Sequence, residues 1–121
     1  MIETDLSQGI HILDTFEANK NISLLSDSAC IIDIVKNEVI SIGLNILKID
    51  YYNFNYGYTF YIILEESHIA LHTWPKENKV HLDIFVCNYS IDNTNKAYSI
   101  YNFLKKIFNP KLTEKQVIFR K

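Results

Sequence analysis

Reactive side chains gather in one short stretch of the sequence, Leu64 to Pro75, where an apolar run meets a polar cluster. The members of this stretch that could take part in chemistry are Glu65, Glu66, Ser67, His68, His72 and Trp74. Twenty positions after the serine, Cys87 closes a second apolar run. A hydroxyl becomes a nucleophile beside a base, imidazole accepts protons near neutral pH, and a thiol can return them. The pattern therefore predicts nucleophilic and acid–base chemistry.

Metal binding is a second interpretation of the same residues, with His68, His72, His81 and Cys87 as ligands. Alternating polar and apolar positions, ended by Pro75, favour a strand for His68 to Trp74. Four residues along a strand span about 13 Å, which is too far for His68 and His72 to bind one ion. We therefore expect no metal. Composition alone leaves a further alternative open, in which the histidines are hydrogen-bonded strand residues and Ser67 is a turn residue.

Length and composition limit the class of protein. A chain of 121 residues with 48% hydrophobic and 13% aromatic residues has room for one folded domain with a core of its own. No apolar run approaches the roughly 20 residues of a membrane span, and Met1 to Gly9 does not resemble a signal peptide. We expect a soluble cytoplasmic protein with Cys30 and Cys87 as free thiols. A net charge of -2 gives no general attraction to nucleic acid or membranes.

Apolar periodicity predicts two helices. Leu25, Ala29, Ile32, Val35, Val39 and Ile42 recur at steps of three and four, which predicts a helix from about Ile22 to Ile42 that Gly43 ends. Asp92 or Asn93 can cap a second helix that ends at Asn109-Pro110. The face of this helix that we expect to be buried consists of Ala97, Ile100, Tyr101, Leu104, Ile107 and Phe108.

Runs rich in β-branched and aromatic residues predict the strands Gly9–Phe16, Leu44–Phe54, Tyr58–Leu64, His68–Trp74, Val80–Cys87 and Val117–Phe119. The run from Tyr58 to Leu64 is typical of a strand covered on nearly both faces. Short turns join the middle strands, so we expect an α+β, two-layer sandwich, with an antiparallel sheet and both helices on one face. The other face then needs a cover, for which a second copy of the chain is the simplest choice.

Several motifs together resemble the short prokaryotic S-adenosylmethionine decarboxylase proenzyme family. These motifs are Glu66-Ser67-His68, His72-Thr73-Trp74-Pro75 and Leu82-Asp83-Ile84-Phe85-Val86-Cys87, and the specific match extends from about Tyr56 to Asn88. The resemblance implies a pyruvoyl-dependent decarboxylase of polyamine biosynthesis, with residues 1–121 as a single domain. It also implies self-cleavage between Glu66 and Ser67, which gives chains 1–66 and 67–121 and a homodimer of processed protomers.

The resemblance also implies a role for each matching residue. Ser67 would attack the carbonyl of Glu66 and become the pyruvoyl group that forms a Schiff base with substrate, so that neither metal nor pyridoxal phosphate is needed. His72 would be the base in processing, and Thr59 stands where the family has a serine that stabilises the oxyanion. Cys87 would return a proton to the substrate α-carbon.

Substrate residues are where the sequence departs from the family. Asn53 replaces the phenylalanine that stacks on adenine, with Phe54 adjacent, and Lys76 replaces the glutamate that binds the ribose. The other residues that we expect near a small amino-acid-type substrate are Glu65, His68 and Trp74. We expect S-adenosylmethionine as substrate, with two alternatives open: free arginine or ornithine as substrate, and a catalytically silent partner subunit.

Overall fold

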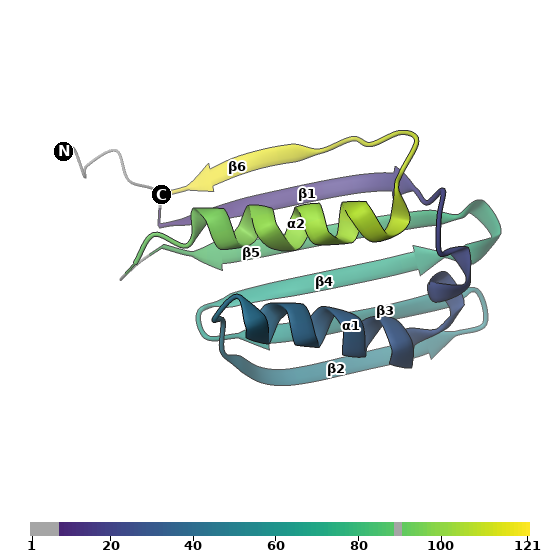
Figure 1. The fold of residues 1–121 in the computed structure, drawn as a ribbon, viewed down its shortest axis with the longest axis horizontal. Helices are drawn as coiled ribbons and strands as arrows, with labels where there is room; N and C mark the ends of the chain where they lie inside the picture. Colours follow the sequence, from purple (N-terminus) through teal and green to yellow (C-terminus); the bar gives the residue numbers. More distant parts are fainter. Residues whose placement is uncertain (1–7, 89–90) are drawn as a thin grey trace.

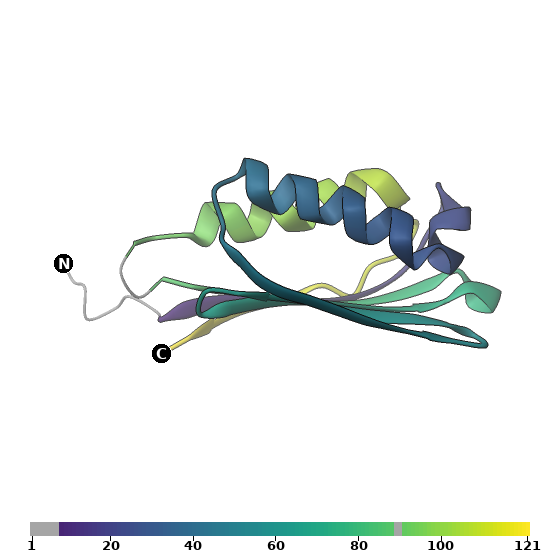
Figure 2. The same ribbon diagram turned by 90° about the horizontal axis from the view of Figure 1, so that it is seen from below.

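The computed structural model describes residues 8–88 and 91–121, which form one antiparallel sheet and two α-helices. The elements are β1 Gly9–Glu17, η2 Ile22–Ser26, α1 Ser28–Ser41, β2 Ile46–Phe54, β3 Gly57–Leu64, β4 Ser67–Trp74, η3 Pro75–Glu77, β5 Lys79–Cys87, α2 Thr94–Phe108 and β6 Gln116–Arg120. The strand order is β2-β3-β4-β5-β1-β6 (Figure 1). Both helices lie on the same face of the sheet (Figure 2), so the expected two-layer α+β fold is confirmed.

Alternation along each strand separates a helix-covered face from an open face, the name used below for the sheet face away from the helices. In β3 the side chains of Tyr58, Phe60 and Ile62 are buried under the helices. Those of Tyr61 and Ile63 point the other way and are 40% and 39% exposed. The expectation that this strand is covered on nearly both faces is therefore wrong for the single chain, because both helices pack on one side.

The first predicted helix is divided in two. Ile22–Ser26 is a 3-10 turn, and the α-helix begins only at Ser28, where Asp27 caps it by accepting a hydrogen bond from the Cys30 N–H at 3.1 Å. Tyr58 and Thr73 explain the break, because their hydroxyls donate to the carbonyl oxygens of Leu24 and Leu25 at 2.7 and 2.9 Å. Those contacts hold the 3-10 carbonyls toward the sheet.

The break also changes which side chains α1 buries. Ile31 and not Ile32 is fully buried, while Val35 and Val39 are buried as expected. The C-terminus of the helix agrees with the prediction, since Gly43 follows it with φ +89°, a conformation that glycine adopts without strain.

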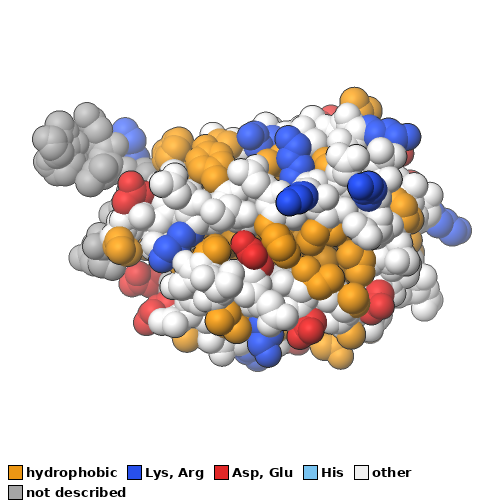
Figure 3. Space-filling view, viewed as in Figure 1, with side chains coloured by type: hydrophobic (Ala, Val, Ile, Leu, Met, Phe, Trp, Pro, Cys, Tyr) orange, Lys and Arg blue, Asp and Glu red, His pale blue; other side chains and the backbone are white. Residues whose placement is uncertain are grey.

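The second helix agrees more closely with its sequence. Of its expected buried face, all members are buried except Ile107, which is half-buried. Tyr101 donates a hydrogen bond to the buried carboxylate of Asp14 at 2.7 Å, which ties α2 to β1. Viewed from the helix side, the surface has hydrophobic side chains near its centre and charged side chains scattered around them (Figure 3).

Hydropathy of the helices bears on the membrane question. Within the described residues, neither helix is long and apolar enough to span a bilayer.

Candidate active site

A two-residue turn, Glu65-Glu66, joins β3 to β4 and places Ser67 opposite Leu64 in the sheet. Glu66 has φ 61°, in the left-handed region that residues with a Cβ rarely adopt. Such a backbone costs on the order of 1 kcal/mol, and this strain lies directly at the bond between Glu66 and Ser67. The turn is exposed at both glutamates, and the Glu65 carboxylate accepts a hydrogen bond from the Asn45 side chain at 3.2 Å.

Ser67 and Cys87 are brought together at the adjoining ends of β4 and β5. The backbone N–H of Cys87 donates to Ser67 Oγ at 2.9 Å, and both residues are half-buried. A pocket of about 170 Å³ lies beside them, bounded by the turn, by residues 43–45 between α1 and β2, and by the start of α2. The predicted serine and thiol therefore share one small site.

Thr59 and His72 form a second group, on the open face. They are register partners in β3 and β4, and Thr59 Oγ1 lies 2.7 Å from His72 Nδ1. Ser67 is five residues away from His72 on β4, roughly 16 Å along an extended strand. Within one chain the predicted base therefore cannot reach the predicted nucleophile.

Trp74 and His81 adjoin this second group on the open face. Their rings are 4.4 Å apart, and the Trp74 ring is 6.2 Å from that of His72. Burial lowers the pKa of His81, and the nearby His72 and Lys79 lower it further. This shift favours the neutral form of the His81 imidazole at pH 7.

His68 points to the open face, as alternation along β4 predicts, but it belongs to a cluster that the sequence did not reveal. His11 Nε2 and His68 Nε2 lie 2.6 and 3.2 Å from Asp83 Oδ1, and Tyr61 stacks on the His68 ring at 5.3 Å. Only the register of β1, β4 and β5 places these residues together.

His11, His68 and Asp83 also offer possible metal-ligand atoms within 4.8 Å of one another. They are not the set of metal ligands that the sequence suggested. Arg120 Nη1 lies 3.2 Å from His11 Nδ1, and a guanidinium can only donate. His11 Nδ1 is thus the acceptor, and Nε2 carries the proton that it gives to Asp83. Both ring nitrogens of His11 and Nε2 of His68 take part in this hydrogen-bonded network, so we assign it no metal.

The remaining substrate candidates line a pocket of about 490 Å³ at the opposite end of β3 and β4 from Ser67. Phe54 and Lys76 both line it, and the Phe54 ring stacks on Tyr56 at 5.2 Å and 11°. Asn53 accepts a hydrogen bond from Ser28 Oγ at 2.8 Å, so its side chain faces α1. Of these two neighbours at the end of β2, Phe54 is therefore the one that offers an aromatic ring to this pocket.

The expected site residues are therefore distributed over four places in one chain: the Ser67–Cys87 pair with its turn, the Thr59–His72 pair with Trp74, the cluster of His68 with His11 and Asp83, and the Phe54–Lys76 pocket. Sequence reasoning missed Asp83 and Asn93 as neighbours of this chemistry. The alternation of β5 carried a signal for Asp83, since it shares a face with His81 and Phe85.

The fold and these sites define a class of protein: an α+β two-layer sandwich in which a serine that follows a strained hairpin turn lies next to a cysteine of the neighbouring strand. A family model described as S-adenosylmethionine decarboxylase matches residues 10–121. An S-adenosylmethionine decarboxylase proenzyme of Hydrogenobaculum is 31% identical over 114 residues, 93% of this chain and 81% of that protein. One of Pyrobaculum arsenaticum is 33% identical over 93 residues, 75% of this chain and 71% of that protein.

A solved structure agrees with the sequence comparisons. The crystal structure of the adenosylmethionine decarboxylase from Aquifex aeolicus superposes with a TM-score of 0.83 at 26% identity, covering 95% of this chain and 92% of that one. The chain belongs to the S-adenosylmethionine decarboxylase family. The expected family is confirmed, and the comparisons give no support to an arginine or ornithine decarboxylase or to a silent subunit.

Proposed function

We propose that this chain is a self-processing pyruvoyl-dependent decarboxylase that acts on S-adenosylmethionine in polyamine biosynthesis in the cytoplasm. The geometry around Ser67 carries the proposal. The preceding residue, Glu66, has a strained backbone, and the Cys87 N–H donates a hydrogen bond to Ser67 Oγ at 2.9 Å. The names of the relatives support the substrate. The single domain, residues 1–121, would become chains 1–66 and 67–121.

Processing begins with the hydroxyl of Ser67. Its oxygen attacks the carbonyl carbon of Glu66, the C–N bond breaks, and an ester replaces the amide. A base then removes the Ser67 Cα proton, the Cβ–O bond breaks, and the Glu66 carboxylate leaves as the end of the first chain. Water converts the resulting dehydroalanine to a pyruvoyl group and ammonia. The left-handed backbone at Glu66 favours the first step because cleavage releases its strain.

The residues around Ser67 fit a carbonyl cofactor at this position. When formed, the pyruvoyl group supplies an electron sink for the carbon that loses carbon dioxide. Cys87 lies beside it and is the proton donor to that carbon. A thiol is a general acid that can give its proton to a carbanion.

The base requires a second copy of the chain. His72 and Thr59 lie on the open face, too far from Ser67 of the same chain, and this face also presents partly exposed apolar residues such as Tyr61, Ile63 and Ile118. A two-fold dimer through the open faces would bury these residues. In this dimer the end of one sheet that carries Ser67 would lie against the middle and the opposite end of the other sheet. His72 and Thr59 of one copy would then serve Ser67 of the second.

The same arrangement supports the choice of substrate. In such a dimer the Phe54–Lys76 pocket of one copy adjoins the Ser67 site of the other, and an adenine ring would stack on Phe54. Stacking on an aromatic side chain contributes about 1–3 kcal/mol, which compensates for the phenylalanine absent at Asn53. Lys76 donates to a ribose hydroxyl, and Glu65, His68 and Trp74 complete the small-molecule site.

Intact-mass spectrometry together with a carbon dioxide release assay tests the proposal. The purified protein is expected to consist of two fragments that meet between Glu66 and Ser67, the second with a blocked N-terminus, and to release carbon dioxide from S-adenosylmethionine. Ser67→Ala is the control and should remain one folded, inactive chain. A wild-type chain that stays intact would rule out the proposal, and release from arginine or ornithine instead would rule out the substrate.

A further inference from the structure

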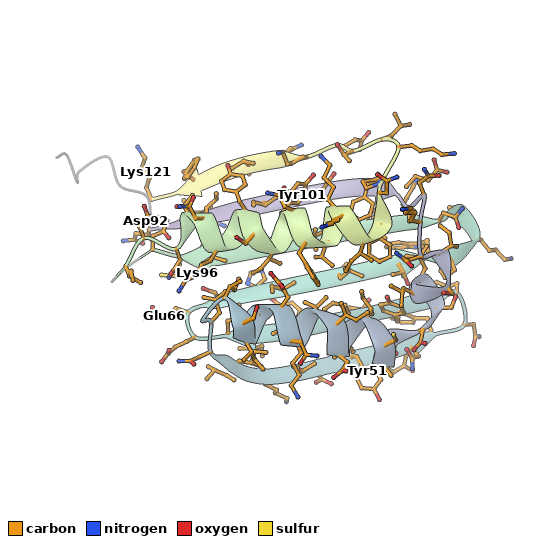
Figure 4. All side chains as sticks on the ribbon, viewed as in Figure 1. Tyr51, Glu66, Asp92, Lys96, Tyr101 and Lys121 are labelled. Carbon is orange, nitrogen blue, oxygen red and sulfur yellow. The ribbon has the colours of Figure 1, made fainter. Side chains whose placement is uncertain are left out.

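Asn93 immediately precedes α2 and occupies its N-cap position, yet its side chain does not cap the helix. An asparagine at this position ordinarily accepts a hydrogen bond from an N–H of the first turn. Here that task falls to Asp92, whose carboxylate accepts from the Thr94 N–H at 3.0 Å. The Asn93 amide is therefore available for another purpose. Asp92 and Lys96 mark this end of α2 near Glu66 (Figure 4).

The Asn93 amide is directed at the end of β5. Its Nδ2 donates to the backbone carbonyl of Cys87 at 3.0 Å, while the Cys87 N–H donates to Ser67. Asn93 is itself held, because its N–H donates to Asn88 Oδ1 at 2.7 Å. Asn88 in turn donates to Thr94 Oγ1 at 2.9 Å. Both backbone polar groups of Cys87 are thus fixed, which fixes the position from which its side chain projects.

This arrangement has a cost. Asn93 Oδ1 is buried and is the sole side-chain polar atom of residues 8–88 and 91–121 that is buried without a hydrogen-bond partner. Turning the amide over would point an oxygen at the Cys87 carbonyl, so the bond to Cys87 fixes the orientation of the amide. A buried acceptor without a partner is destabilising, and native proteins retain few of them. Stability alone therefore does not explain the geometry of Asn93.

We propose that Asn93 is a positioning residue: by anchoring the Cys87 carbonyl, it aims the Cys87 thiol at the carbon that receives the proton. The inference rests on the proposed function. After carbon dioxide leaves, a proton reaches the substrate carbon, and water then cleaves the C=N bond to residue 67, which releases the product amine and restores the pyruvoyl group. If the proton reaches the carbon of residue 67 instead, water cleaves the C=N bond on the substrate side. Residue 67 then keeps the nitrogen as alanine, and the substrate departs as an aldehyde.

The fraction of protein molecules that carry alanine at residue 67, called the alanine share below, therefore measures how well the Cys87 thiol is directed at the substrate carbon. Peptide mass spectrometry after a fixed number of turnovers measures it separately from the rate. Asn93→Ala is expected to raise this share about fivefold to tenfold, the factor that one such hydrogen bond corresponds to. Asn88→Ala, which removes the support of Asn93, should change it in the same direction. Asn45→Ala is the matched control, since Asn45 lines the same pocket but bonds to Glu65.

A second readout does not need the cofactor. In a His72→Ala background, which retains Ser67 and is expected to stay uncleaved, the alkylation rate of Cys87 reports how firmly the thiol is held. Asn93→Ala should raise that rate about fivefold relative to the exposed Cys30 of the same molecule. A merely structural role of Asn93 would change stability without changing the alanine share.

The outcomes separate the two proposals. An uncleaved wild-type chain overturns the proposed function together with the role of Cys87 in it. A cleaved and active wild type whose alanine share is the same in Asn93→Ala overturns the positioning role alone, as does an equal rise in Asn45→Ala. Unchanged alkylation of Cys87 in Asn93→Ala has the same meaning.

Discussion

Thr59 Oγ1 and His72 Nδ1 lie 2.7 Å apart, and this contact determines which nitrogen of His72 is available. A base must present a nitrogen without a proton. If Nδ1–H donates to Thr59, then Nε2 is that nitrogen, and the hydroxyl fixes both the tautomer and the orientation of the ring. Threonine keeps the hydroxyl of the family serine, so the substitution is conservative in its chemistry.

Removing that hydroxyl tests the assignment. Thr59→Val keeps the shape of the side chain but takes away the partner of His72 Nδ1, so the half-time of self-cleavage should lengthen about fivefold to tenfold. Gel electrophoresis of freshly purified protein over time measures the half-time. Thr59→Ser is the control and should process at the wild-type rate. Equal half-times for the valine and serine variants would contradict the role of Thr59.

At the scale of elements, the β3–β4 hairpin is the place where backbone conformation and chemistry coincide. Tight turns with a positive φ normally use glycine or asparagine, which adopt it at little cost. This turn uses Glu66, with φ 61°, so it retains strain that a different residue would remove. The adjoining strands overdetermine the turn, since β3 pairs with β2 and β4 with β5.

Glu66→Gly should separate strain from side-chain chemistry. In an uncleavable Ser67→Ala background we expect it to raise the free energy of unfolding by about 0.5–1 kcal/mol, measured by urea denaturation. In the processing-competent chain the half-time of cleavage should lengthen. Asparagine tolerates a positive φ but retains a Cβ, so the stability and the cleavage half-time of Glu66→Asn should lie between those of the wild type and Glu66→Gly. A glycine variant that is more stable yet cleaves at the normal rate would show that strain does not assist cleavage.

Two buried tyrosines each connect a helical element to a strand, and they make the stability of the fold depend on pH in the alkaline range. Tyr58 bonds to the 3-10 turn and Tyr101 to Asp14. Burial raises the pKa of both phenols, and the negative charges of Asp27 near Tyr58 and Asp14 near Tyr101 raise it further. The unfolded chain therefore loses these protons at lower pH than the folded chain. Their stabilising contribution is complete below about pH 10 and decreases above it.

Urea unfolding of the Ser67→Ala chain at a series of pH values checks this sign. The free energy of unfolding should fall as pH rises above about 10, because the unfolded state then binds fewer protons than the folded state. Replacing both Tyr58 and Tyr101 by phenylalanine should lower stability at pH 8 and flatten the fall. If the free energy of unfolding of the double variant fell with the same slope, groups other than these two tyrosines would be responsible for the pH dependence.

For the whole molecule, the proposed division of the site between two copies predicts that two inactive variants complement each other. Ser67→Ala and His72→Ala chains are each expected to stay uncleaved. Coexpressed, they should form mixed dimers in which Ser67 of the second chain meets His72 of the first, so that only the His72→Ala chain is cleaved. Differently tagged chains and mass spectrometry identify which one is cut. Absence of cleavage in dimers shown to be mixed would contradict the shared site.

Local chemistry in the sequence was sufficient for much of this protein. Alternation placed His68, His72 and Trp74 on one face of a strand, and the steps of the apolar residues predicted α2 almost residue for residue. The short turns between strands predicted an antiparallel sheet with helices on one side. These features depend on residues near one another in the chain, and local periodicity records them directly.

Contacts between distant segments decided the rest, because no local pattern encodes them. Hydroxyls from β3 and β4 broke the first helix at Asp27, and the register of three strands assembled His11, His68 and Asp83. The sequence set Ser67, His72 and Cys87 in one motif, but the extended strand between Ser67 and His72 keeps them roughly 16 Å apart. Only the tertiary structure pairs Ser67 with Cys87 and turns Asn93 from its helix toward that pair.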